Sequence, residues 1–392
     1  KQHGERYDVV VTVQPTSPLV LPSDLERAIA RFEDANVDTV LSVVDDRHLC
    51  WTMQDAVPVP AYSKRVNRQQ LVPNFRETGA IIACRRGQLE LGTRIGGRVA
   101  LHEIPHERSF DIDTPIDFYL CESILARKRV VFVVVGHAAV GLGHAFRSVT
   151  LAHELVRHAV SFVCPETSDL AIEYIRRHNY PVEICEEKRL LDAVQALRPD
   201  MVVNDILDTD AGYVRALKSA GARVVNFEDL GAGCEHADLV VNALYPHTSE
   251  NKHTLVGAEY FCLRDEFLHL PATAPGDSLD RVLVTFGGVD EGNLTARVIR
   301  LLVPLCIDRG IAIDVITGPG YAHQAALDSL VKQLGYPLLI VVPATRRISE
   351  YMVRAGMAVT SGGRTVLELA ALRVPTVVIC QNLRETTHAF TS

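Results

Sequence analysis

The chain lacks several features that would place it in a specialised class of protein. No apolar run in its 392 residues approaches the length of a membrane-spanning helix, and its first residues lack the pattern of a secretory signal peptide. Positive charge is not in excess, because the formal net charge is -8, which argues against nucleic acid as a partner. Hydrophobic residues make up 47% and charged residues 22%, a balance typical of globular proteins with large cores.

Paired cysteines are also missing. The nine cysteines are scattered singly and no two have Cys-x-x-Cys spacing, so neither a zinc site nor a disulfide framework is predicted. Most lie in apolar runs, where a cysteine behaves as a small buried hydrophobe, and a reducing cytoplasm is the simplest compartment. The chain does not begin with methionine, and both of its ends lie close to expected strands. We therefore expect it to be part of a longer sequence.

The most informative stretch is residues 130–155. Val130–Val135 is a run of β-branched and aromatic residues, which predicts a fully buried strand. The sequence Gly-Leu-Gly-His at 141–144 then forms a turn, and apolar residues at helical spacing follow. Strand, turn and helix in this order begin a doubly wound nucleotide-type domain, whose helix N-terminus offers N–H groups to phosphate. His144 can transfer protons near neutral pH, and Arg147 lies one helical turn further on.

The first 127 residues alternate expected strands with expected helices. Strands are predicted at residues 8–13, 39–44, 78–84 and 99–104. A capping box formed by Ser23 and Glu26 predicts a helix to about residue 34, and Thr114 followed by Pro115 predicts a second helix to about residue 126. Residues 45–75 are punctuated by prolines and are expected to be irregular.

Two polar segments in this part could carry chemistry. Residues 14–19, Gln-Pro-Thr-Ser-Pro-Leu, follow the first strand, and ligands of α/β sheets bind at strand carboxyl ends. An ordinary proline-rich turn is an equally good reading of that spacing. Asp111 and Asp113 alternate on an extended segment and could share a hard cation such as Mg²⁺. For an isolated pair of this kind, a helix cap with an extra surface aspartate is the commoner explanation.

Taken together, four segments in this order resemble the acylneuraminate cytidylyltransferases, which convert CTP and a nine-carbon acidic sugar into a CMP-sugar and pyrophosphate. The segments are residues 14–19, 67–73, 77–81 and 111–118. The resemblance implies that Gln14, Thr16 and Ser17 line the site, and that Arg68 and Gln69 face the nonulosonic acid. It also implies that Asp111 and Asp113 hold Mg²⁺, and that the protein forms a homodimer.

The resemblance covers roughly residues 6–127, and the sequence departs from the family at several points. Val20 stands where the family usually has arginine, and Thr78 stands where many members have asparagine. The glycine- and lysine-rich loop that wraps the CTP phosphates in the family is missing from this sequence. Cytidylyl transfer is therefore expected only if that loop is supplied.

Residues 128–270 and 280–392 each repeat the alternation of strand and helix, and Pro271–Asp277 between them reads as a hinge. We therefore predict an α/β protein with a partial Rossmann-like nucleotidyltransferase domain at 1–127. A two-lobed, GT-B-like pair of doubly wound domains is expected to follow it, with a cleft between the lobes. The second lobe has glycine-rich loops at 286–295 and 361–365, where small residues let a diphosphate approach backbone N–H groups.

These loops resemble those of the UDP-sugar hydrolases of pseudaminic acid synthesis, of spore-coat polysaccharide proteins and, in the last motif, of MurG-like glycosyltransferases. The resemblance implies that His144 is the general base for an attacking water, that Arg147 meets phosphate, and that Glu368 holds the ribose. His137 is a rival base. The other residues implied to bind the substrate are Gly287, Gly288, Asn293, Ser361, Gly362, Gly363, Thr365, Gln381 and Asn382.

One departure concerns the base itself. Relatives often carry an aspartate nine residues before the histidine, where this chain has Val135. Asp205, Asp208 and Asp229 lie near expected strand ends and could substitute for it.

The leading hypothesis is a bifunctional protein of nonulosonic acid biosynthesis, with a CMP-sugar synthetase-like half and a half that hydrolyses a UDP-sugar and releases UDP. One alternative is a GT-B glycosyltransferase that uses a UDP-sugar and an acceptor. The other is a binding module for nucleotide sugars without catalytic activity.

Overall fold

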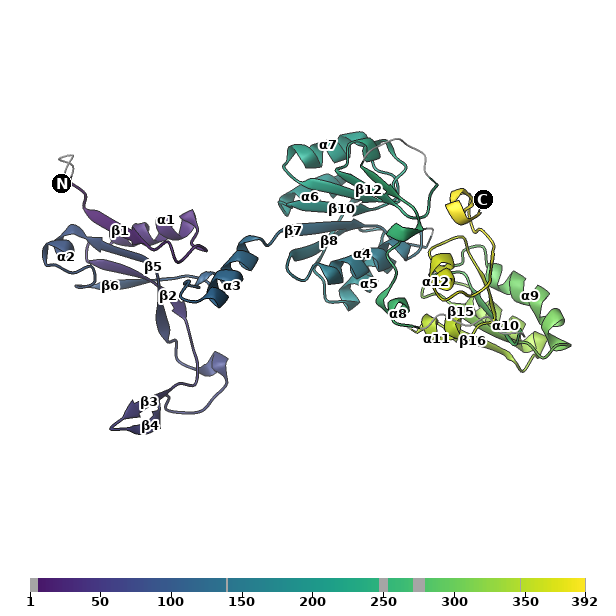
Figure 1. Cartoon of the computed structure of the whole chain (residues 1–392), viewed down its shortest axis with the longest axis horizontal. Helices are drawn as coiled ribbons and strands as arrows, with labels where there is room; N and C mark the ends of the chain where they lie inside the picture. The colour runs from purple at the N-terminus through teal and green to yellow at the C-terminus, as the bar shows by residue number, and fades with distance from the viewer. Residues whose placement is uncertain (1–5, 139, 247–252, 271–278, 346, 392) are drawn as a thin grey trace. The chain divides into compact units, whose positions relative to one another are not determined.

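The computed structural model describes residues 6–138, 140–246, 253–270, 279–345 and 347–391 (Figure 1). The chain divides into two compact units, unit 1 at residues 1–127 and unit 2 at residues 128–392. The hinge expected at Pro271–Asp277 lies outside the described residues. Within the described residues, no helix is both long and apolar enough to cross a membrane.

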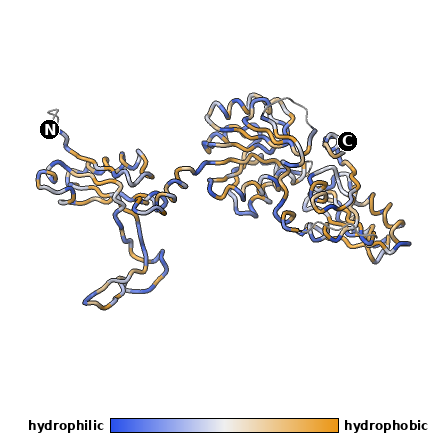
Figure 2. Tube along the Cα trace, in the orientation of Figure 1, coloured by the Kyte–Doolittle hydropathy of each residue, from blue (hydrophilic) through white to orange (hydrophobic). Residues whose placement is uncertain are grey.

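Unit 1 is built on a four-stranded mixed sheet in the order β1-β5-β2-β6. β1 (Val9–Val13) and β2 (Thr39–Asp45) both run antiparallel to β5 (Phe75–Arg85), and β6 (Val99–Glu103) runs parallel to β2. Apolar residues are concentrated on the sheet strands (Figure 2). Helix α1 (Pro22–Ala30) covers the sheet, since its buried Ala28 packs with Val40 and Ile81.

The two helix starts expected in unit 1 have different outcomes. Helix α3 (Pro115–Leu125) begins where it was expected, and the Thr114 hydroxyl accepts the N–H of Asp117 at 3.3 Å. The capping box assigned to Ser23 and Glu26 is wrong, because α1 begins earlier and the Asp24 carboxylate accepts the N–H of Leu21 at 2.9 Å. Unit 1 also contains a short helix α2 (Arg86–Glu90) and the 3-10 turns η1 (Arg31–Glu33) and η3 (His106–Arg108).

Residues 45–75 are more regular than expected. β3 (Trp51–Gln54) and β4 (Val57–Pro60) form an antiparallel hairpin apart from the main sheet, and η2 (Arg68–Gln70) follows. Asp55 and Ala56 turn the chain with φ of 48° and 66°. Prolines are compatible with this hairpin, because a two-stranded ribbon has only edge strands.

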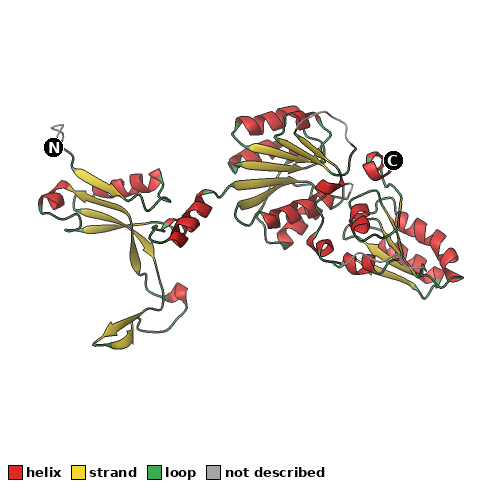
Figure 3. Ribbon diagram, viewed as in Figure 1, coloured by secondary structure: helices red, strands yellow, loops and turns green. Residues whose placement is uncertain are grey.

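The first lobe of unit 2 is a parallel sheet in the order β13-β12-β11-β10-β7-β8-β9. Helices cover both of its faces (Figure 3). The strands are β7 (Arg129–Val134), β8 (Ala159–Pro165), β9 (Val182–Cys185), β10 (Met201–Asp205), β11 (Arg223–Phe227), β12 (Leu239–Asn242) and β13 (Thr254–Val256). The helices are α4 (Gly143–Glu154), α5 (Asp169–Arg177), α6 (Leu190–Ala196) and α7 (Ala211–Ser219), with 3-10 turns η4 (Glu187–Arg189), η5 (Ala232–Glu235) and η6 (Ala258–Tyr260).

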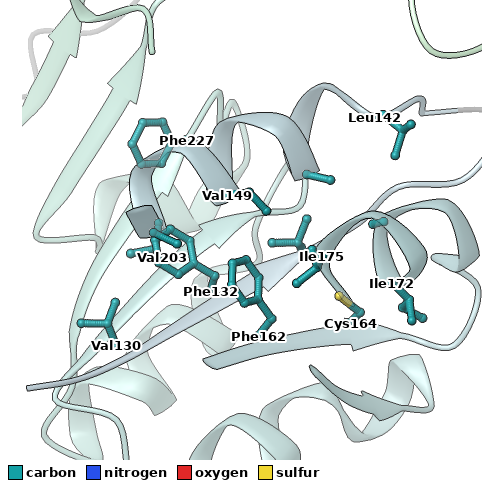
Figure 4. Packing of buried hydrophobic residues seen from close by; sticks show 14 of the residues in the cluster. Val130, Phe132, Leu142, Val149, Phe162, Cys164, Ile172, Ile175, Val203 and Phe227 are labelled. Atoms are coloured by element: carbon teal, nitrogen blue, oxygen red, sulfur yellow. The ribbon is translucent and has the colours of Figure 1, made fainter. Parts of the chain in front are cut away.

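The interior strand β7 explains why the run at 130–134 has no polar position. Val130 and Phe132 pack in one cluster with residues of α4 and α5, and Phe132 stacks on Phe162 (Figure 4). Val131 and Val133 point to the opposite face and pack with residues of α6 and α7. Since successive side chains of a strand alternate between faces, a strand covered on both sides must be apolar throughout.

The second lobe is a parallel sheet in the order β16-β15-β14-β17-β18. Its strands are β14 (Arg281–Thr285), β15 (Ala312–Thr317), β16 (Leu339–Pro343), β17 (Met357–Thr360) and β18 (Thr376–Val378). Its helices are α9 (Leu294–Ile307), α10 (Gln324–Leu334), α11 (Ile348–Val353) and α12 (Thr365–Ala371), preceded by α8 (Asp265–Leu268) and followed by the 3-10 turns η7 (Glu385–Thr387) and η8 (Ala389–Thr391). Val282 and Val284 pack toward α9, whereas Leu283 packs toward α11 and α12.

The predicted α/β class with two parallel-sheet lobes is confirmed by these strand orders. β13 and α11 were not predicted, because each is too short to leave a clear periodic pattern.

Candidate functional site

A cavity of about 520 Å³ lies between the two lobes of unit 2. Its first-lobe wall includes residues 140–144 and 146–147, together with Glu228 and Tyr245. Its second-lobe wall is formed by the segments that follow β14, β15, β16, β17 and β18. Since these segments leave the carboxyl ends of parallel strands, the cavity lies where α/β sheets usually bind ligands.

A hydrogen-bonded group of charged residues, the His144 cluster, stands at the first-lobe wall. It consists of His144, Arg147, Ser148, Asp205 and Glu228. Asp205 is its centre: one carboxylate oxygen bonds to His144 Nδ1, and the other accepts Ser148 Oγ at 3.1 Å. Arg147 donates to both oxygens of Asp205, from Nε at 2.8 Å and from Nη2 at 2.6 Å. The bidentate geometry and the shared carboxylate hold the three side chains in one arrangement.

Asp205 resolves the departure at Val135. Asp205 is the last residue of β10, and it pairs in register with Val134 of the neighbouring strand β7. The carboxylate of Asp205 therefore reaches His144 from the end of the neighbouring strand β10. The residues between β7 and His144 supply no carboxylate. Of the alternatives named from the sequence, Asp208 pairs with Arg384, and Asp229 bonds to Thr209.

Glu228 is the last member of the His144 cluster, and its backbone has a positive φ. Its Oε1 accepts Arg147 Nη1 at 3.0 Å, and its carboxylate also accepts the N–H groups of Ala243 and Leu244, each at 3.2 Å. Its φ of 51° lies in the left-handed region, as do those of Leu207 and Ala344, which also line the cavity. Non-glycine residues in this region are held there at a cost in energy, and they gather at functional sites.

The charges of the cluster stabilise one another. Burial by itself raises the pKa of Asp205, but the neighbouring Arg147 and His144 more than offset it and hold that pKa below its usual range. Burial lowers the pKa of Arg147, and Asp205 and Glu228 more than offset it, so that pKa is raised. The carboxylate and the guanidinium are therefore both ionised at neutral pH.

This arrangement leaves one nitrogen of His144 available. With Nδ1 bonded to Asp205, a neutral imidazole carries its proton on Nδ1, which leaves the Nε2 lone pair as acceptor. No hydrogen bond to Nε2 is found within the described part of the chain, and His144 lines the cavity. The side chain can therefore take a proton from a molecule in the cavity. His137, the rival base, does not line the cavity, and its carbonyl accepts the N–H of Gly141.

Arg147, predicted to meet phosphate, is bonded to carboxylates in the structure. Its Nε, Nη1 and Nη2 atoms are all bonded to carboxylates, and the residue is 2% exposed. Although Arg147 contributes to the cavity wall, its hydrogen-bonding groups are occupied by Asp205 and Glu228. Asp205, to which Arg147 is bonded on both oxygens, is also the partner of His144.

The second-lobe wall contains most of the second-lobe residues that the sequence assigns to substrate binding. The cavity-lining members of that set are Gly287, Gly288, Ser361, Gly363, Thr365, Glu368, Gln381 and Asn382. Gly287 has a φ of 76°, a conformation that favours glycine, and the Gln381 amide donates to the Phe286 carbonyl at 2.9 Å. The loops after β14 and β18 are thus tied together at the cavity.

Two other members of that set do not line the cavity. Gly362 does not face the cavity, and its N–H donates to Glu385 Oε2 at 3.0 Å. Asn293 is the residue before α9, with a φ of 49°, and its side-chain oxygen accepts the Tyr321 hydroxyl at 2.7 Å. Binding of substrate by Asn293 therefore stays a prediction.

Glu368 is paired with an arginine that the sequence did not suggest. Arg264, just before α8, donates to both oxygens of Glu368 at 2.8 and 3.0 Å. Burial lowers the pKa of Arg264, and Glu368 more than offsets it, so the net shift is upward. A ribose hydroxyl that bonds to Glu368 would therefore share the carboxylate with Arg264. Arg264 belongs to no local sequence motif, because its partner Glu368 is 104 positions away along the chain.

In unit 1, part of the predicted site comes together around Gly79. Ser17 Oγ donates to Asp111 Oδ1 at 3.2 Å, and the carbonyl of Thr16 accepts the N–H of Ile112 at 2.8 Å. Gly79 has a φ of 71°, and a Cβ placed on it would lie 2.9 Å from Gln14 Oε1 and 3.6 Å from Asp111 Oδ2. Three segments distant in sequence therefore meet at one point, which we call the Gln14 cluster (Gln14, Ser17, Gly79 and Asp111).

The remaining predicted residues of unit 1 are more dispersed. Arg68 and Gln69 are exposed on η2, and Asp113 is exposed with its N–H bonded to Asp117 at 3.3 Å. Within the described ranges, no group of three or more histidine, cysteine or acidic residues could hold a metal ion. Mg²⁺ usually takes one or two carboxylates together with substrate phosphates, so binding by Asp111 and Asp113 stays a prediction.

No family model matches the chain. It is 26% identical over 272 residues to an uncharacterized protein of Methanocaldococcus jannaschii, a match that covers 65% of this chain and 56% of the archaeal protein. It is 29% identical over 134 residues to N-acylneuraminate cytidylyltransferase A of Danio rerio, covering 32% of this chain and 31% of that enzyme. The chain thus spans about half, or less, of the length of these relatives.

Among solved structures, MurG of Acinetobacter baumannii aligns with a TM-score of 0.47 and 16% identity, over 66% of this chain and 80% of that chain. MnaA of S. aureus, solved with UDP, aligns with a TM-score of 0.41 and 11% identity, over 64% of this chain and 79% of that chain. The chain thus has partial sequence similarity to N-acylneuraminate cytidylyltransferases.

Proposed function

We propose that unit 2 is a nucleotide-sugar enzyme in which His144 is the general base. The observation that carries the proposal is the His144–Asp205 pair at the wall of a cavity whose opposite wall is made of glycine-rich loops. A histidine oriented by a carboxylate suits proton abstraction, and loops of small residues suit close approach of a diphosphate.

The reaction is the hydrolysis of a UDP-sugar. His144 Nε2 takes a proton from water as the water oxygen bonds to the anomeric carbon, and the bond between that carbon and the phosphate oxygen breaks. UDP leaves with the bonding electrons, and the imidazolium returns its proton to solvent. Asp205 stabilises the imidazolium, and Arg147 keeps the aspartate ionised and in place.

The experiment is a measurement of UDP release from a panel of UDP-N-acetylhexosamines, including 2,4-diacetamido sugars, with and without sugar acceptors. His144→Asn should lower the rate by roughly 10²–10⁴-fold, the usual contribution of a general base. His153→Asn is the matched control, because His153 is exposed on the same helix and does not line the cavity.

An unchanged rate in His144→Asn would remove the proposed role of this residue. Release of UDP only in the presence of an acceptor would identify a glycosyltransferase instead of a hydrolase. Binding of a UDP-sugar without turnover under either condition would favour a binding module.

For unit 1 we infer a cytidylyl-transfer site at the Gln14 cluster. The support is the meeting of Gln14, Ser17 and Asp111 around Gly79, together with the sequence similarity to N-acylneuraminate cytidylyltransferases. The test is pyrophosphate release from CTP, Mg²⁺ and a nonulosonic acid by the full chain, supplied with the glycine- and lysine-rich loop that the family carries. Asp111→Asn should abolish release, whereas Glu26→Gln, an exposed change on α1, should not. Release that survives in Asp111→Asn would contradict the assignment.

A further inference from the structure

Among the described residues, four arginines line the cavity of unit 2, and one of them differs from the rest in its partners. Arg147 pairs with Asp205 and Glu228, Arg264 with Glu368 and Glu266, and Arg384 with Asp208. Arg364 makes no ion pair with any of the described residues.

The guanidinium of Arg364 is only partly satisfied. Its Nη2 donates to the carbonyl of Cys262 at 2.6 Å, and its Cζ lies 4.4 Å from the centre of the Phe261 ring. Its Nη1 is shielded from solvent and has no hydrogen-bond partner among the described residues. A buried donor without a partner costs free energy, and more so when it carries charge. The side chain is thus a cation that a neighbouring anion would stabilise.

The position of Arg364 connects this charge to the base. Arg364 lies between Gly363 and Thr365, in the glycine-rich loop of the second lobe. Its stem crosses to the first lobe, where a Cβ on Gly143 would lie 3.0 Å from Arg364 Cδ. Gly143 directly precedes His144, so the absence of a side chain there makes room for the arginine beside the base. Burial and the nearby Arg147 lower the pKa of Arg364 to about 10, which leaves it charged at neutral pH.

We propose that Arg364 binds the diphosphate of the nucleotide substrate and neutralises the charge that develops on the leaving phosphate. The inference rests on the proposed function and names the cation that Arg147, with its nitrogens already paired, does not supply. Because Arg364 lines the cavity and its Nη1 has no partner among the described residues, we expect a rotation of its terminal bonds to turn Nη1 toward a bound phosphate. A guanidinium suits this role, since it can donate two parallel hydrogen bonds to phosphate oxygens.

The experiment is calorimetric titration of the full chain with UDP, UMP, uridine and inorganic pyrophosphate. Arg364→Met should weaken the binding of UDP and of pyrophosphate by at least about tenfold, the value of a charge-assisted hydrogen bond, and should leave uridine binding unchanged. Arg364→Lys keeps the charge but not the fork, so it should recover part of the loss. Arg300→Met, an exposed change on α9, is the control, and thermal unfolding checks that each variant is folded.

Equal affinity of wild type and both Arg364 variants for UDP and pyrophosphate would overturn the inference while the proposed function stands. Binding of pyrophosphate without any uridine compound would instead remove UDP from the proposed function. In that case, loss of pyrophosphate binding in Arg364→Met still supports the anion site. A parallel loss of uridine affinity in Arg364→Met would show a collapsed cavity and contradict a specific phosphate contact.

Discussion

At the scale of single residues, Asp205 is the centre of the His144 cluster. It is fully buried, yet it bonds to His144, Arg147 and Ser148. A buried carboxylate is stable only with such compensation, and the same contacts fix the tautomer of the base. The residue thus couples the stability of the lobe to the orientation of His144.

Asp205→Asn should both destabilise the protein and slow the reaction. The amide leaves the buried Arg147 short of a charged partner, and breaking a buried ion pair from one side typically costs about 3–5 kcal/mol. The amide can also donate to His144 Nδ1 and favour the wrong tautomer. The free energy of unfolding in urea measures the first effect and UDP release the second. Asp192→Asn, an exposed change on α6, should alter stability by no more than about 0.5 kcal/mol. A stability like that of wild type would contradict the central role of Asp205.

The lowered pKa of Asp205 predicts a dependence of stability on pH. A carboxyl whose pKa is lower in the folded state stabilises that state above the ordinary carboxyl pKa of about 4, and the stabilisation is lost as the pH falls further. The free energy of unfolding of the wild type should therefore fall more steeply below about pH 4 than that of Asp205→Asn. Asp24, whose pKa is lowered to about 2 despite burial, should add an acid-sensitive contribution in unit 1 that both proteins share. Parallel curves for the two proteins below pH 4 would contradict this assignment.

At the scale of elements, the loop after β17 is held by a residue from the end of the chain. Glu385 Oε2 accepts the N–H of Gly362 at 3.0 Å and the N–H of Gln381 at 2.7 Å. One carboxylate thereby joins the loop after β17 to the segment after β18. Burial raises the pKa of Glu385, so its two N–H contacts offset the cost of burial only in part.

Variants of Glu385 separate its geometry from its charge. Glu385→Ala should free the loop and weaken UDP binding, because two N–H groups then lose their acceptor. Glu385→Gln should retain much of the affinity, since an amide oxygen can accept both N–H groups. Calorimetric titration with UDP compares the two variants. Equal loss in both would mean that the negative charge, rather than the loop geometry, is what matters.

At the scale of the whole unit, the two lobes of unit 2 are joined by the segment that follows β18. Arg384 donates to both oxygens of Asp208 at 3.1 and 2.9 Å, and to the carbonyl of Glu228 at 3.1 Å. The N–H of Ala389 donates to the carbonyl of Leu244 at 2.7 Å. Residues of the second lobe thus contact the first lobe directly beside the cavity.

A double-mutant cycle on Arg384 and Asp208 should detect this connection. Because both side chains are partly exposed, we expect a coupling of about 0.2–1 kcal/mol in the free energy of unfolding. The single variants Arg384→Ala and Asp208→Ala should also weaken UDP binding to similar degrees. The cycle Lys218–Asp238, an exposed pair within the first lobe, is the control, since its removal should leave UDP affinity unchanged. Additive effects of Arg384→Ala and Asp208→Ala on both quantities would exclude the connection.

The division of the chain into two units leads to a prediction at the largest scale. Unit 1 and unit 2 each bury separate hydrophobic clusters, such as that around Ala28 and Ile81 and that around Val282 and Ile299. A protein of residues 128–392 should therefore fold alone and bind UDP with the affinity of the full chain. Circular dichroism and calorimetric titration test this, and loss of UDP binding in the shorter chain would show that unit 1 supports the site.

The sequence by itself determined the strands that are covered on both faces, because such a strand must be apolar at every position, as at 130–134 and 282–284. It also pointed to His144 and to the glycine-rich loops, because turns at strand ends have local signatures. The hairpin at 51–60 was missed, since its prolines read as irregular structure and its pairing partners are polar or exposed.

Only the tertiary structure decided which charges meet. Asp205 reaches His144 over 61 positions, and Arg264 reaches Glu368 over 104 positions. Such pairs depend on strand order, because β10 lies beside β7 in the sheet although β8 and β9 separate them along the chain. The same packing pairs Arg147 with Asp205 and leaves Arg364 as the cavity arginine without an ion pair among the described residues. Local patterns specify an element, but a long-range pairing is set by the packing of whole sheets.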